Sequence, residues 1–92
     1  MDDPMGPLRE RFRARAATHA EALDRAVAAQ DEAALVALAH KLAGSAAIFG
    51  FAELGACASQ IDEAAAAGGP TLDLPAVGQL LAGLRAIAHD AD

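Results

Sequence analysis

Apolar residues recur every three or four positions along most of the chain, which is the spacing that places them on one face of an α-helix. This pattern covers four segments, residues 7–29, 32–49, 51–65 and 75–88. Its members are Leu8, Phe12, Ala16, Leu23 and Ala26; Leu35, Leu38, Leu42 and Phe49, with the hydroxyl of Ser45 among them; Phe51, Leu54, Ala58, Ile61 and Ala65; and Val77, Leu80, Leu81, Leu84, Ile87 and Ala88. The sequence therefore predicts four amphipathic helices.

Signals for helix ends lie between these segments. Asp31 stands where an N-cap residue is favoured. Gly50 interrupts the pattern after the second segment, and the run Gly68-Gly69-Pro70 is the strongest break in the chain. Four helices with short connections predict an all-α fold, an antiparallel four-helix bundle with up-down-up-down order. We expect a single domain over residues 7–92, preceded by a flexible N-terminal tail at residues 1–6.

Composition agrees with a helical protein. The 92 residues are 54% hydrophobic but only 3% aromatic, and much of the apolar content is alanine, the strongest helix former. Thirteen acidic residues outnumber seven basic ones, and the net charge of −6 argues against a nucleic-acid-binding protein. Arg9, Arg11, Arg13 and Arg15 are interpreted as the solvated side of the first helix, with steering of an acidic partner as the alternative.

A few residues bear on location and metal binding. Cys57 is the only cysteine and cannot form an internal disulfide, which fits the reducing cytoplasm. The acidic N-terminus has no apolar signal segment, and no apolar run approaches the ~20 residues that cross a bilayer. We therefore expect a cytoplasmic protein that makes no contact with a membrane. His19, His40 and His89 lack the spacing of metal ligands, so no metal site is expected.

The second segment contains one histidine in an unusual setting. His40 projects about 170° away from the centre of the leucine cluster of its helix, so it should face solvent. The residues around it on that exposed face are small and apolar rather than charged: Val36, Ala37, Ala43 and Gly44, with Ala33 and Ala47 farther along. A glycine inside a helix costs about 1 kcal/mol relative to alanine. We expect Gly44 to leave room beside the imidazole, the alternative being that it packs under a neighbouring helix.

An exposed imidazole is largely neutral at cellular pH, and one of its ring nitrogens is then available as a nucleophile. No carboxylate lies three or four residues from His40 to orient it, and no Ser-His-Asp arrangement is visible. This setting favours a carrier of a transferable group over a catalyst. The alternative is a surface histidine without a function. Ser45 and His19 are interpreted as structural, Ser45 through a hydrogen bond to a main-chain carbonyl and His19 through partial burial.

The stretch AHKLAGSAAIFGF at residues 39–51, followed by Leu54 and Ile61-Asp62, resembles the core of histidine-containing phosphotransfer (HPt) domains. The resemblance implies that His40 is phosphorylated on its outer ring nitrogen. It would accept the phosphoryl group from a receiver-domain aspartate, as in a hybrid histidine kinase, and pass it to another receiver domain, as in a response regulator. The implied docking surface consists of Val36, Ala37, Ala43, Gly44, Ala47 and, at its edge, Asp62. Mg²⁺ is expected in the receiver, and no cofactor in this chain.

The sequence departs from the family pattern beside the histidine. Members often have lysine three residues after the histidine, where this chain has Ala43, and its only lysine is Lys41. We expect Lys41, Ala43 and Gly44 to lie nearest the phosphoryl group, with Lys41 as a partial substitute for the missing cation.

Other functions are weighed against the carrier. A docking module of the same fold that binds receivers without carrying phosphate is the main alternative. A kinase is disfavoured because no Gly-rich phosphate-binding loop precedes a helix. We find no second apolar face for dimerisation and expect a monomer. The initiating Met and short tail favour a free protein over a segment of a hybrid kinase.

Overall fold

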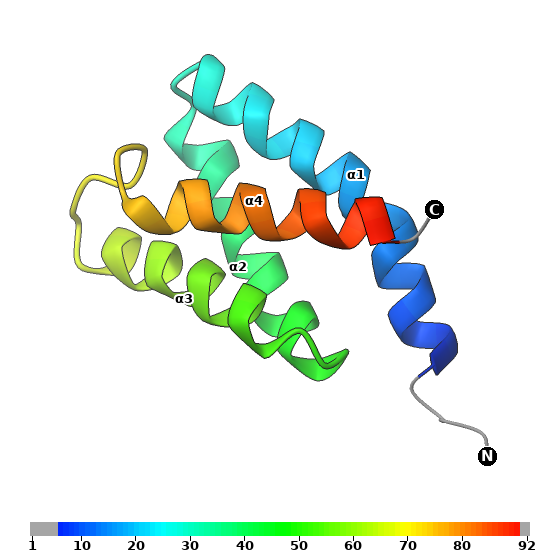
Figure 1. The fold of residues 1–92 in the computed structure, drawn as a ribbon. Helices are drawn as coiled ribbons and strands as arrows, with labels where there is room; N and C mark the ends of the chain where they lie inside the picture. The colour runs from blue at the N-terminus through cyan, green and yellow to red at the C-terminus, as the bar shows by residue number, and fades with distance from the viewer. Residues whose placement is uncertain (1–5, 91–92) are drawn as a thin grey trace.

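The computed structural model describes residues 6–90, which form four helices: α1 (Gly6–Ala28), α2 (Glu32–Ile48), α3 (Ala52–Ala66) and α4 (Pro75–Asp90). Each bound lies within two residues of the predicted one. Each helix packs against two neighbours, α1 against α2 and α4, and α3 against α2 and α4. Consecutive helices run antiparallel (Figure 1), which confirms the predicted all-α four-helix bundle. The predicted tail lies outside the described residues except for Gly6, which begins α1.

Local sequence signals explain where the helices begin and end. Asp31 caps α2 as predicted, because its Oδ1 atom accepts a hydrogen bond from the Ala34 amide at 3.1 Å. Gly50 and Gly68 have φ angles of +90° and +77°, in the left-handed region that glycine adopts at little cost. They follow α2 and α3 respectively, so the two glycines turn the chain at the ends of these helices.

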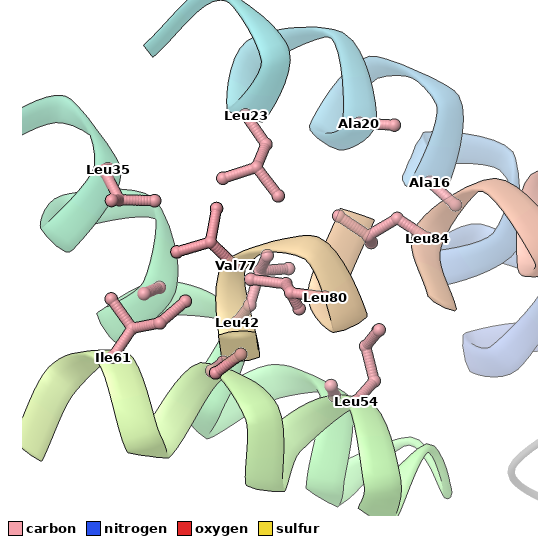
Figure 2. Close-up of a cluster of buried hydrophobic side chains, with 14 of the residues drawn as sticks. Ala16, Ala20, Leu23, Leu35, Leu42, Leu54, Ile61, Val77, Leu80 and Leu84 are labelled. Carbon is pink, nitrogen blue, oxygen red and sulfur yellow. The ribbon is translucent and has the colours of Figure 1, made fainter. Parts of the chain in front are cut away.

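Leucine, isoleucine and alanine side chains from all four helices form the core. Figure 2 shows the larger ones converging between the helices. Leu23, Leu35, Leu42, Ile61, Leu80 and Leu84 have no exposed surface, and neither do Ala16, Ala39, Ala46 and Ala58. Because the alanines are small, the helices approach closely around the larger side chains. Truncating one of these leucines to alanine typically costs about 2–5 kcal/mol of stability.

The buried face of α2 differs from the predicted one. Leu38, Ser45 and Phe49 were expected on the core side, but they are only half-buried. The buried residues besides Leu35 and Leu42 are Ala39 and Ala46. The sequence pattern gave most weight to large side chains. The buried direction of α2 is set instead by the neighbouring helices, and only small side chains fit where α2 meets them.

The interpretation of the four arginines is wrong for two of them. The Arg9 Nε atom donates a hydrogen bond to the Phe49 carbonyl at 3.2 Å. The Arg13 guanidinium lies 5.8 Å from the centre of the Phe51 ring. Residues two apart on a helix differ in direction by about 200°, so four arginines at this spacing cannot share one face. Two of them, Arg9 and Arg13, pack on the α2–α3 connection, while the two between and after them stay exposed.

The long α3–α4 connection is tied to the start of α2. Thr71 is 1% exposed, and its hydroxyl donates a hydrogen bond to Glu32 Oε2 at 3.0 Å. A buried hydroxyl needs such a partner to offset its loss of water. Across residues 6–90, no helix has both the length and the apolar character needed to cross a membrane.

Candidate functional site

His40 lies in the middle of α2, on the side away from the core. Its side chain is 77% exposed, whereas the preceding residue, Ala39, is fully buried. The prediction that the imidazole faces solvent is therefore confirmed. A partner protein can approach the ring without any rearrangement of the bundle.

Asp62 of α3 holds one nitrogen of this ring. Its Oδ2 and Oδ1 atoms lie 3.1 Å and 3.3 Å from His40 Nδ1. An ionised carboxylate can only accept hydrogen bonds, so Nδ1 carries the proton and its N–H donates a hydrogen bond to Asp62. In the neutral ring, Nε2 is then the nitrogen with a free lone pair. The contact orients an otherwise exposed imidazole and favours the tautomer with the proton on Nδ1.

The orienting carboxylate is the feature that the sequence did not reveal. Along α2 itself no carboxylate stands three or four positions from His40, and the sequence predicts Asp62 only at the edge of a docking surface. Asp62 comes from another helix, 22 residues along the chain. One sequence signal pointed toward this position: Asp62 directly follows Ile61, which is buried. A residue next to a buried one lies near the edge of the helix face that packs on its neighbour.

Close packing of α2 on α3 explains why a short aspartate reaches the imidazole. Gly55 of α3 is buried, and a Cβ atom added to it would lie 3.2 Å from both the Cβ and the main-chain nitrogen of Ala47. Ala47 follows His40 by seven residues on α2, and Gly55 precedes Asp62 by seven on α3. In an antiparallel pair, the Ala47–Gly55 and His40–Asp62 contacts therefore belong to the same register. Glycine at position 55 lets the two backbones approach.

The surface around His40 is made of small side chains, as predicted. Ala37, Gly44 and Ala47 are exposed, and a Cβ atom added to Gly44 would have no neighbour within 4 Å. The expectation that Gly44 leaves open space is confirmed. Val36 and Ala43 are half-buried, and Ala43 packs against the core.

Comparison with known proteins identifies the family to which the chain belongs. The sequence profile of the Hpt domain family matches residues 7–90, nearly the whole chain. The chain is an Hpt domain. Members of this family are phosphocarriers of histidine phosphorelays and not independent catalysts, and they interact with receiver domains. No curated protein and no solved structure matches the chain.

Lys41 of this Hpt domain lies beside α1. It is exposed and lines a hollow between α1 and α2, together with Arg15 and His19. Burial lowers the pKa of His19, and the positive charges of Lys41 and Arg15 lower this pKa further. His19 is half-buried with its ring 6.0 Å from that of Phe12, as expected of a structural residue.

Two further residues have structural contacts. The Ser45 hydroxyl donates to the Lys41 carbonyl at 3.0 Å, which confirms its predicted role within α2. The half-buried Cys57 thiol lies 3.7 Å from Gln79 Oε1. Within the described part of the Hpt domain, no three histidine, cysteine or acidic residues cluster as metal ligands would. The family needs no cofactor in this chain.

Proposed function

We propose that His40 is the phosphorylated residue of this Hpt domain. It would accept a phosphoryl group from the aspartate of one receiver domain and pass it to the aspartate of another. The observation that supports this most directly is that one side chain is both highly exposed and oriented: the imidazole is 77% exposed, and a carboxylate lies 3.1 Å from its Nδ1 atom.

The reaction exchanges one bond to phosphorus for another. The His40 Nε2 lone pair attacks the phosphorus of the receiver's acyl phosphate, the P–O bond to the aspartate breaks, and the aspartate leaves as a carboxylate. The ring gains positive charge as the P–N bond forms. The Asp62 carboxylate, hydrogen-bonded to the Nδ1 proton, stabilises that charge. Attack by a second receiver's aspartate reverses these steps and restores the neutral ring.

The small side chains around His40 support docking of a receiver over α2. Val36, Ala37, Ala43, Gly44 and Ala47 form the proposed contact surface, with Asp62 at its edge. Lys41, Ala43 and Gly44 are the proposed neighbours of the phosphoryl group, Lys41 through its flexible stem. We place Mg²⁺ in the receiver, beside the aspartate, and the relay in the cytoplasm, as the free thiol of Cys57 allows.

A transfer assay tests the proposal. A receiver domain phosphorylated with a radiolabelled small phosphodonor is mixed with the chain, and the label on the chain is followed on a denaturing gel. We expect label that is lost in acid and kept in base, and none on the His40→Gln variant. Label on His40→Gln would refute the assignment. Binding of the receiver without transfer would favour the docking module that carries no phosphate.

A further inference from the structure

Positive charge is concentrated on one side of an acidic molecule. The chain has a net charge of −6, yet five of its seven cationic residues are Arg9, Arg11, Arg13, Arg15 and Lys41. Among residues 6–20 the only acidic one is Glu10. The first half of α1 and the adjoining part of α2 therefore form a cationic region.

A hollow of about 240 Å³ lies between α1 and α2 within this region. Its apolar wall includes Phe12, which is buried, and Phe49, which is half-buried. Arg11, Arg15 and Lys41 line it as well, and all three are exposed. We call this hollow the cationic groove. It combines an apolar wall with a charged rim, as protein-binding sites do.

The three cations of the groove are available to a partner. Among the described residues Arg13 pairs with Glu10 and Arg85 with Asp24, whereas Arg11, Arg15 and Lys41 form no ion pair within residues 6–90. The charges of Arg15 and Lys41 also converge, since both act on the half-buried His19. Three like charges around one hollow attract an anionic group more strongly than scattered ones do.

The two flanks of His40 differ in charge. On the α3 side lies Asp62, whose carboxylate contacts the ring. On the α1 side lies the cationic groove, which begins at Lys41, the next residue after His40. An acidic partner is therefore repelled from the α3 flank and drawn toward the α1 flank.

We propose that the cationic groove docks an acidic, apolar-edged segment of the receiver domain and so sets the side from which the receiver reaches His40. This inference rests on the function proposed above. A receiver must bring an aspartate and metal-binding carboxylates to a domain that is itself strongly acidic. Contact with the groove offsets this repulsion, and the short path along α2 lets one partner cover the groove and His40 together.

Kinetics of receiver binding test the inference. Receiver domains of the same genome are screened unphosphorylated by surface plasmon resonance, and the tightest binder is the probe. The Arg11→Gln/Arg15→Gln variant keeps polar side chains of moderate length but loses two charges. We expect a roughly five- to tenfold loss of affinity at low salt, mainly from slower association, and a weaker dependence on salt. Circular dichroism verifies the fold.

Arg25→Gln is the matched control, because Arg25 is an exposed arginine at the other end of α1. We expect it to bind as the wild type does. Equal binding by all three proteins, or an equal loss in Arg25→Gln, overturns the inference. Salt-sensitive self-association of the wild type that the double variant abolishes would also overturn it, since the occupant would be a second copy.

Labelling with phosphoramidate separates this inference from the proposed function. The double variant should be labelled on His40 at the wild-type rate, because a small donor does not need the groove. If no receiver binds while His40 is still labelled, the docking inference fails alone. If His40 is not labelled by any donor while the groove variants still change receiver binding, the phosphocarrier assignment fails and the docking site stands.

Discussion

At the scale of single residues, the contact between His40 and Asp62 determines how the imidazole reacts. A histidine that is 77% exposed would otherwise exchange between two tautomers. The Asp62 carboxylate favours the form with the proton on Nδ1 and so keeps Nε2 as the nucleophile. Because the His40–Asp62 pair is exposed, its contribution to the free energy of unfolding should be small. Substitution of Asp62 should therefore change the rate of phosphoryl transfer more than the stability of the fold.

Substitution of Asp62 tests this positioning role. In Asp62→Ala we expect phosphoryl acceptance to slow roughly two- to fivefold, in line with ~0–1 kcal/mol for an exposed charge pair. Asp62→Asn, whose amide oxygen can still accept a hydrogen bond from Nδ1–H, should lose less. Imidazole ¹⁵N chemical shifts should show a larger share of the Nε2–H tautomer in Asp62→Ala. An unchanged tautomer ratio would contradict the role.

Removal of His40 should abolish transfer without harming the fold. The side chain faces solvent and its contact with Asp62 is exposed, so His40→Gln should change the free energy of unfolding by less than ~0.5 kcal/mol. Urea denaturation measures this change. A loss of several kcal/mol would show that His40 is a structural residue.

His19 should give the domain a pH-dependent stability. Its pKa in the folded state is lowered from 6.5, first by burial and then by Lys41 and Arg15. Below pH 6.5 the unfolded chain therefore binds the proton more readily, and the free energy of unfolding falls as the pH drops from 7.5 to 5. Denaturation of His19→Asn should show a smaller fall over this range. An equal fall in His19→Asn and in the wild type would contradict this role of His19.

At the scale of helices, the packing of α2 on α3 distinguishes two glycines. Gly44 faces open space, so Gly44→Ala should stabilise the protein by about 0.5–1 kcal/mol through helix propensity. Gly55 lies against Ala47, where an added methyl group meets main-chain atoms at 3.2 Å. Gly55→Ala should therefore destabilise the protein by about 1–3 kcal/mol. Urea denaturation compares the two, and stabilisation by both would contradict the close α2–α3 approach.

At the scale of the whole molecule, charge and exposed apolar surface bear on association. Among the described residues only Leu8 and Ile48 are exposed large hydrophobic side chains, 37% and 66% respectively. Single exposed residues of this kind do not make a dimer interface, which needs a contiguous patch. The net charge of −6 adds repulsion between copies.

The chain should therefore be a monomer in solution. Sedimentation equilibrium at moderate salt should give one species close to 9.3 kDa across the concentration range. A second species near twice that mass would contradict the prediction, and it would point to the cationic groove as a place where two copies meet.

The sequence by itself determined the helices, because their signals are local. The spacing of apolar residues, the capping residues and the helix-ending glycines all act within a few residues. Asp31 and Gly50 therefore predicted where α2 starts and ends. The same periodicity turned His40 away from the core, and the small residues after it resembled the HPt motif. These properties depend on one helix at a time.

Only the tertiary structure decided what lies opposite each helix. The carboxylate of Asp62 contacts His40 because Gly55 allows α3 to approach α2 closely. The two residues are 22 positions apart, so no local spacing in the sequence predicts their contact. Arg9 and Arg13 likewise turn inward because they pack on the α2–α3 connection. The cationic groove exists because Lys41 of α2 lies beside α1. Such contacts are set by the register and distance between helices, which depend on the packing of all four together.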